Sequence, residues 1–339
     1  MTYGINSRAD VRIETHVVPS SHKRQILCAT DLSEGSEHAV HRALLLARQL
    51  DARLLLLHVV DDRQLVQVIG LQADRARSVL QHQSRQFSSI DKPGAEISVR
   101  VGKPHQTIVS VAKEWDADLV ILGAYRKRTG DRFLGTTAER VVRAATRPVL
   151  IVNGEAATVY HSVLLASDLS DEYAQVAHMT QQLGLLEGAR VSVVHALEPA
   201  RASALYTAGV TEPYIARYLR SLRQASRETL REQMHTAGLA SSHVYVTQEH
   251  ARPFRAIERA VVDTSPQLLV VGMSRYAALK RLLSGSIANE VLRKIECDVL
   301  IASPAAVQHV RSTIDGRMRQ DDAVKTATAT LLNETETTA

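Results

Sequence analysis

The stretch Cys28-Ala29-Thr30-Asp31-Leu32-Ser33 recurs 137 residues later as Leu165-Ala166-Ser167-Asp168-Leu169-Ser170. The same offset separates His58 from His195, so nothing is inserted across the first strand, first helix and second strand of each copy. Solenoid repeats span about 20–50 residues, whereas a repeat of this length is the size of a domain. The sequence therefore predicts two tandem domains in one polypeptide.

The two copies can be aligned over residues 23–153 and 160–303, which we take as the domain boundaries. Residues 1–22 and 304–339 match neither copy, and we expect mobile segments there, the second of them rich in threonine. Between the second and third strands the offset grows by 12 residues, which places an insertion in the helical region 199–238 of the second copy.

Short apolar strands alternate with helical segments in each copy. The fourth strands, at 119–123 and 268–272, are continuous apolar runs, which is typical of strands covered on both faces. This alternation predicts an α/β fold with a doubly wound, five-stranded parallel sheet in each domain. We expect the remaining strands at 25–29, 53–59, 96–101 and 148–152 in the first copy, and at 162–166, 190–195, 243–248 and 299–302 in the second.

Composition predicts a soluble cytoplasmic protein. Hydrophobic residues make up 45%, aromatic residues 4%, and the net charge is only +5, which argues against a nucleic-acid-binding surface. The two cysteines form no CxxC motif, as expected in a reducing compartment. No apolar run approaches the roughly 20 residues that a membrane span requires.

Three features that are distant in sequence converge on one place. In a sheet of order 3-2-1-4-5, ligands bind between the carboxyl ends of strands one and four. Asp31 follows the first strand, Gly123 ends the fourth, and Gly135 opens the next helix. Their counterparts in the second copy are Asp168, Gly272 and Gly285.

The helix that follows the fourth strand leaves two interpretations open. Thr136 and Glu139 fit a capping box, which would make this an ordinary capped helix. Glycine directly before Thr136 would alternatively leave the first N–H groups open to an anion such as phosphate. An aspartate across the crevice suits the donors of a ribose or an adenine amino group, so the residues together describe a nucleotide-shaped pocket.

These residues resemble the universal stress protein family in its tandem-domain form. The resemblance implies domains of strand order 3-2-1-4-5, similar to adenine nucleotide alpha hydrolases, and a subgroup of the family binds ATP through Gly-x-x-Gly, nine residues, then Gly-(Ser/Thr). Gly272-Met273-Ser274-Arg275 stands nine residues before Gly285-Ser286 and keeps this spacing. Gly123-Ala124-Tyr125-Arg126 stands eight residues before Gly135-Thr136 and is one residue short.

The resemblance also implies roles for individual residues. Asp31 and Asp168 would contact the adenosine, and the backbones of Val59 and Ala196 would meet the edge of the adenine. The ribose and phosphates would be lined by Gly123, Gly135 and Thr136 in the first copy and by Gly272, Gly285 and Ser286 in the second.

Arginine replaces the second glycine of the motif in both copies, at Arg126 and Arg275. A side chain there resists a backbone that needs positive φ or close approach. A guanidinium directed into the crevice could instead hold phosphate oxygens in a bidentate manner. Because the second copy keeps the full spacing, we expect it to be the better nucleotide site.

His58 and His195 invite a catalytic interpretation, but no nucleophile motif or second base recurs with them. We therefore expect packed or capping histidines, no catalytic residue, no metal site, and at most weak ATP hydrolysis.

Two hypotheses follow. The first is a stress-response protein that binds ATP or another adenine nucleotide in at least one domain and acts by binding rather than catalysis. The alternative is a structural or interaction protein whose crevices have lost the ligand. In both, the resemblance implies that the last strands, 149–152 and 299–302, pair to form an internal pseudo-dimer, with a homodimer of whole chains as a further possibility.

Overall fold

The structure is a computed structural model. The two copies together form one compact unit, Lys23–Thr313. The predicted mobile segments lie largely outside the described residues. The described residues are 23–86, 94–126, 132–133, 136–155, 158–197, 205–239, 243–247, 253–272, 287–303, 305–310 and 312.

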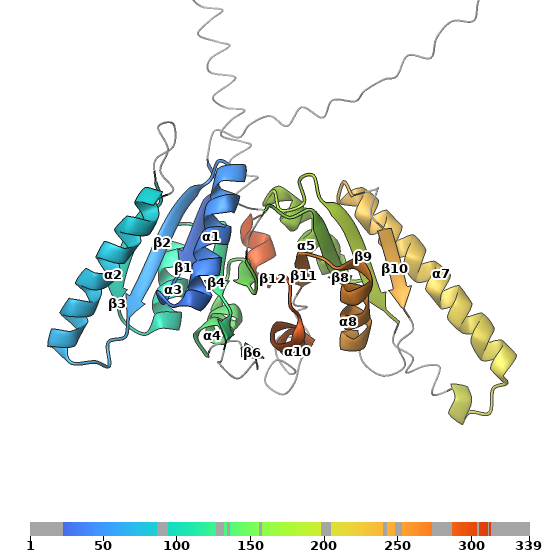
Figure 1. Ribbon diagram of the computed structural model, residues 1–339. Coiled ribbons are helices and arrows are strands. Elements are labelled where there is room, and N and C mark those ends of the chain that lie inside the picture. The colour runs from blue at the N-terminus through green and yellow to red at the C-terminus, as the bar shows by residue number, and fades with distance from the viewer. Residues whose placement is uncertain are drawn as a thin grey trace, which may run out of the picture. The chain divides into compact units, whose positions relative to one another are not determined.

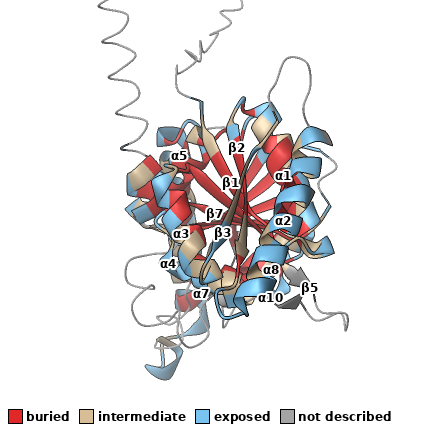
Figure 2. Ribbon diagram, turned by 90° about the vertical axis from the view of Figure 1, so that its left-hand side faces the viewer, coloured by how far each residue is buried: buried red, intermediate tan, exposed pale blue. Residues whose placement is uncertain are grey.

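The first copy forms five parallel strands in the order β3-β2-β1-β4-β7, which is the predicted 3-2-1-4-5 topology. Helices α1 and α2 lie on one side of this sheet, and α3 and α4 on the other (Figure 2). The strands are β1 (Gln25–Ala29), β2 (Arg53–Val60), β3 (Glu96–Val101), β4 (Leu119–Gly123) and β7 (Val149–Val152), and the helices are α1 (Glu34–Gln49), α2 (Val66–Gln86), α3 (Pro104–Glu114) and α4 (Thr136–Ala144).

The second copy repeats this order as β10-β9-β8-β11-β12 (Figure 1). Its α7 has 25 residues against 21 in α2, and it occupies the region where the sequence predicted an insertion. The strands are β8 (Ser162–Ser167), β9 (Arg190–Ala196), β10 (His243–Thr247), β11 (Leu268–Gly272) and β12 (Asp298–Ala302), and the helices are α5 (Asp171–Gln182), α7 (Glu212–Thr236), α8 (Pro253–Thr264) and α10 (Ile287–Lys294).

Apolar side chains of the central strands and the inner faces of the helices make up the core (Figure 2). Leu27 on β1, Leu57 on β2 and Ile151 on β7 are fully buried. Such strands are apolar on both faces because helices cover both sides of a doubly wound sheet. Among the described helices, none combines the length and apolar character needed to cross a membrane.

One element was not predicted. The sequence suggested a polar loop between β4 and α4, but part of it is a short antiparallel hairpin, β5 (Tyr125–Arg126) with β6 (Arg132–Phe133). Two-residue strands carry too little periodicity to be recognised from sequence. The hairpin becomes important below because α10 of the second copy contacts β6.

The two copies are joined edge to edge. Strand β12 pairs antiparallel with β7, which merges the two sheets into one of ten strands and confirms the predicted pairing of the last strands. The paired residues are Val299 with Ile151, Leu300 with Leu150, and Ile301 with Val149, and all six are buried.

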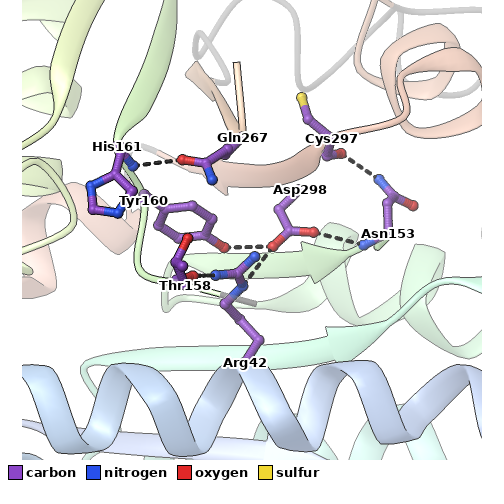
Figure 3. A network of polar contacts seen from close by, with 8 residues as sticks. All are labelled: Arg42, Asn153, Thr158, Tyr160, His161, Gln267, Cys297 and Asp298. Atoms are coloured by element: carbon purple, nitrogen blue, oxygen red, sulfur yellow. Dashed lines mark hydrogen bonds and ion pairs between the residues drawn. The ribbon is translucent and has the colours of Figure 1, made fainter. Parts of the chain in front are cut away.

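A buried polar network crosses this junction (Figure 3). The Asp298 side chain, at the start of β12, is 3% exposed, and its Oδ2 accepts hydrogen bonds from Nε of Arg42 at 2.9 Å and from the hydroxyl of Tyr160 at 2.7 Å. Its Oδ1 accepts from the backbone N–H of Asn153 at 2.9 Å. Arg42 also donates to the carbonyl of Thr158 at 2.6 Å, so the connection between the copies is part of the network.

The network occurs on one side of the junction only. In the repeat alignment the counterpart of Arg42 is Met179, and the counterpart of Asp298 is Pro148. The symmetric position therefore holds no ion pair. Arg42 further lies over the ring of Tyr160, 4.3 Å from its centroid, which adds a cation–π contact to the charged pair.

The chain continues in ordered form beyond the second domain. Residues 305–310 are helical, and Ala306, Val307 and Val310 are buried. His309 approaches the Asp116 carboxylate of the first copy to 3.7 Å. The expected mobile tail from residue 304 is thus wrong for this helical segment, whose apolar residues were too few to distinguish it from the polar sequence that follows.

Replacing Asp298 with alanine should leave the Arg42 guanidinium buried without its carboxylate. We expect the free energy of unfolding to fall by about 3–5 kcal/mol, the usual cost of breaking a buried ion pair, measured by urea unfolding. The double variant with Arg42→Met should lose less than the sum of the single losses.

Asp74→Ala is the matched control, because it removes an exposed aspartate paired with Arg77 and should cost less than about 1 kcal/mol. If Asp298→Ala were as mild as Asp74→Ala, the network would not hold the two copies together.

Candidate functional site

Asp31 lies directly after β1 and fixes the turn into α1. Its Oδ1 accepts hydrogen bonds from the backbone N–H of Ser33 at 3.0 Å and from the Ser33 hydroxyl at 2.5 Å. These bonds hold Leu32 at φ 64°, a left-handed conformation that is costly for a leucine. Asp168 and Ser170 repeat the arrangement in the second copy, with the same two distances.

The Asp31 carboxylate is an anion at neutral pH. Partial burial would raise its pKa, but hydrogen bonds from Ser33 and Ser36 favour the ionised form and outweigh the burial, so the pKa lies below its ordinary value. Both bonds from Ser33 go to Oδ1. Oδ2 can therefore accept a hydrogen bond from a ligand hydroxyl or amino group.

The repeated histidines hold neighbouring strands together. Nδ1 of His58 lies 2.9 Å from the carbonyl oxygen of Thr30, and Nδ1 of His195 lies 2.9 Å from that of Ser167. A carbonyl only accepts, so each histidine donates its Nδ1 proton. This supports the predicted structural role, because the ring links the end of the second strand to the turn that follows the first.

A cavity of about 1010 Å³ opens at the carboxyl ends of β1 and β4, which is the place predicted for the site. It brings together four residues that were selected from the sequence, namely Asp31, Val59, Gly123 and Thr136. The lining also includes Glu139, which the sequence offered only as part of a capping box, and polar residues that were not selected as site residues, among them Thr30, Glu34, Ser36, His38 and Arg293.

Helix α4 points its first turn at the cavity. The helix begins at Thr136, and Thr136, Thr137 and Ala138 all line the cavity. The carboxylate of Glu139 accepts a hydrogen bond from Arg143 at 2.5 Å, one turn along the helix. The first turn of α4 therefore lies where an anion in the cavity would meet its free N–H groups, and the anion-binding interpretation stays a prediction.

Arg126 occupies the second glycine position of the motif without backbone strain. It lies in β5, paired with Arg132, and an extended backbone is open to any residue. The objection that this position requires a positive φ therefore does not apply to Arg126. The side chain of Arg126 lies outside the described residues.

Several predicted site residues also lie outside the described part of the chain, namely Gly135, Arg275, Gly285 and Ser286. In the second copy, Asp168, Ala196 and Gly272 occupy the same places at the ends of β8, β9 and β11 as their counterparts do in the first. The preference for the second copy as the better nucleotide site stays a prediction.

Two observations bear on catalysis. Among the described residues, no group of three or more His, Cys, Asp or Glu side chains could hold a metal ion. Burial raises the pKa of the Cys28 and Cys297 thiols to about 12, so neither is a thiolate nucleophile at neutral pH.

Gly123 has a packing role that the sequence did not reveal. A Cβ at this position would lie 2.8 Å from the carbonyl oxygen of Gly35 and 3.0 Å from Cα of Ser36. The start of α1 therefore approaches the end of β4 more closely than any side chain allows. A Cβ at Gly272 would instead lie nearest to Cγ2 of Val176, at 3.1 Å.

The universal stress protein family matches this chain twice, at residues 23–153 and 160–303. A universal stress protein of Methanocaldococcus jannaschii is 26% identical over 153 residues, which cover 38% of this chain and 94% of that protein. Universal stress protein G of Salmonella typhimurium is 33% identical over 128 residues, or 35% of this chain and 89% of that protein. Each relative corresponds to one copy.

Solved structures resemble both copies together. A universal stress protein from Archaeoglobus fulgidus covers 82% of this chain and 98% of its own, with a TM-score of 0.60 and 16% identity. A putative universal stress protein from Pseudomonas aeruginosa covers 86% and 97%, with a TM-score of 0.55 and 20% identity. At these identities the likeness concerns the fold alone.

The glycine geometry predicts unequal effects of the same substitution in the two copies. Gly123→Ala places Cβ against backbone that cannot move alone, so we expect a loss of about 1–3 kcal/mol in the free energy of unfolding. Gly272→Ala meets only a valine methyl and should cost less. Urea unfolding measures both.

Val176→Ala removes the crowded methyl group, so the double variant with Gly272→Ala should lose less free energy of unfolding than the sum of the two single losses. Equal losses for Gly123→Ala and Gly272→Ala would contradict the close approach of α1 to β4.

Proposed function

Since the chain belongs to the universal stress protein family and carries two copies of its domain, we propose that it is a stress-response protein that binds an adenine nucleotide such as ATP. Binding occurs in at least one domain and acts through contacts with partners rather than through turnover. The first domain is the one whose cavity lies within the described residues. We place the protein in the cytoplasm, in keeping with two cysteines that form no disulfide.

The cavity between β1 and β4 carries this proposal. Doubly wound sheets bind ligands at the point where the strand order reverses, and here that point is open, with a volume of about 1010 Å³. A volume of this size lies at the upper end of the range for small-molecule sites.

The two ends of the cavity suit the two ends of a nucleotide. The Asp31 carboxylate accepts hydrogen bonds, which suits a ribose hydroxyl or the adenine amino group. The backbone at Val59 lies beside it for the adenine edge. Across the cavity, the first N–H groups of α4 offer a site for phosphate, which the helix dipole also favours.

Binding without turnover is supported by the state of the candidate catalytic groups. The Nδ1 proton of His58 is committed to the carbonyl of Thr30, and both thiols are held protonated by burial. We therefore propose that hydrolysis of the bound nucleotide is at most weak.

The rival function is an interaction protein whose crevices bind no nucleotide. It is favoured by the buried network around Asp298, because a junction of this kind gives the paired domains a fixed common surface. Denaturing the purified protein and assaying the supernatant for adenine nucleotide distinguishes the two. No released nucleotide and no binding heat with millimolar ATP, ADP or AMP would leave only the rival.

Asp31→Asn should weaken ATP binding in the first copy about tenfold or more, because it removes a charged acceptor from the adenosine end. Asparagine keeps the oxygen that accepts from Ser33, so the turn into α1 should survive. Calorimetric titration with ATP measures the effect.

Asp168→Asn is the matched variant, since the turn around Asp168 has the same geometry. It should weaken ATP binding in the second copy rather than the first, and the double variant should show weakened binding at both sites. If neither substitution changes the affinity while ATP still binds, the nucleotide lies elsewhere.

A further inference from the structure

One residue in the lining of the first copy's cavity comes from the second copy. Arg293 lies on α10, more than 130 residues beyond the end of the first domain, yet it faces the same cavity as Asp31 and Thr136. Every other described lining residue belongs to the first copy. The first pocket is therefore built by both halves of the chain.

The junction between the sheets explains how Arg293 arrives there. Antiparallel pairing of β7 with β12 brings the end of the second copy beside the end of the first. Helix α10 contacts β6, and α4 begins shortly after β6 in the sequence. Arg293 thus lines the same cavity as the first turn of α4.

Arg293 also differs from its counterpart in the first copy. Arg143 occupies the equivalent position on α4, where it is paired with Glu139 at 2.5 Å. In the second copy the residue four positions before the arginine is Asn289, which carries no charge. Arg293 is solvent-exposed and has no hydrogen bond or ion pair with another residue in the described part of the chain.

The charges around the cavity would disfavour a phosphate unless a cation offset them. Asp31, Glu34 and Glu139 all line it, and these carboxylates would repel a polyphosphate. Arg293 is the one Lys or Arg among the described lining residues. A guanidinium presents planar paired donors that match phosphate oxygens and attract them by charge.

We propose that Arg293 of the second copy completes the phosphate end of the first copy's pocket, so that a nucleoside di- or triphosphate bound there bridges the two copies. This rests on the nucleotide binding proposed above. It adds that the first site selects for the length of the phosphate chain, and that the phosphate end of the site is complete only when the two copies are paired.

The test compares ATP, ADP, AMP and adenosine as probes, by calorimetry on the full-length chain carrying Asp168→Asn so that the first site dominates. Arg293→Gln should weaken ATP and ADP about tenfold or more while leaving adenosine within about twofold. Arg293→Lys keeps the charge but loses the paired donors, so its affinity for ATP and ADP should lie between those of Arg293→Gln and the parent.

Lys294→Gln is the control. It removes the same charge from the next residue of α10, but Lys294 lies over the ring of Phe254, 5.0 Å from its centroid, in its own copy. It should bind all four probes like the parent, and thermal unfolding should show both variants folded.

The outcomes separate this inference from the proposed function. If Asp31→Asn weakens ATP but Arg293→Gln does not, the role of Arg293 is overturned and nucleotide binding stands. If Arg293→Gln weakens adenosine as much as ATP, the arginine does not act on phosphate. If the parent binds none of the four probes, both proposals fail.

Discussion

The antiparallel pairing of β7 with β12 is the contact on which the rest of the molecule depends. Unpaired, each strand would expose a row of N–H and C=O groups, a surface prone to association with other chains. Paired, the two edges close each other and leave Val149, Ile151 and Val299 fully buried. The same pairing sets Asp298 against Arg42 and carries α10 to the first cavity, so the packing of the junction and the composition of the site have one origin.

The local pattern of apolar and polar residues was enough to predict the strands and the turn after β1. Apolar runs bounded by polar residues predicted all ten strands of the large sheet, and the repeated Asp31 and Asp168 identified the turn. What the sequence could not show depends on partners far away along the chain. In the sequence, Asp298 looks like any polar residue before a strand. Nothing near it indicates a buried ion pair, because its partner Arg42 is 256 positions away. Arg293 resembles any exposed charge on a helix until the pairing of the sheets is known.

The two copies share the backbone of the turn that follows the first strand. Both hold a leucine in the left-handed region after the first strand, and both tie the second strand to it through a histidine. Two differences concern the residues near the junction. Glu139 pairs with Arg143 in the first copy, whereas the matching position of the second copy is the uncharged Asn289, and the acidic partner of Arg42 exists on one side only.

The one-sided network also bears on how the chain could have evolved. Two second copies meeting through their last strands would bury two carboxylates of Asp298 against Met179, with no guanidinium to compensate them. Two first copies would bury two Arg42 side chains beside Pro148, with no carboxylate. Each half has thus become the specific complement of the other. Two separate chains, one for each domain, should therefore associate with each other in preference to associating with themselves.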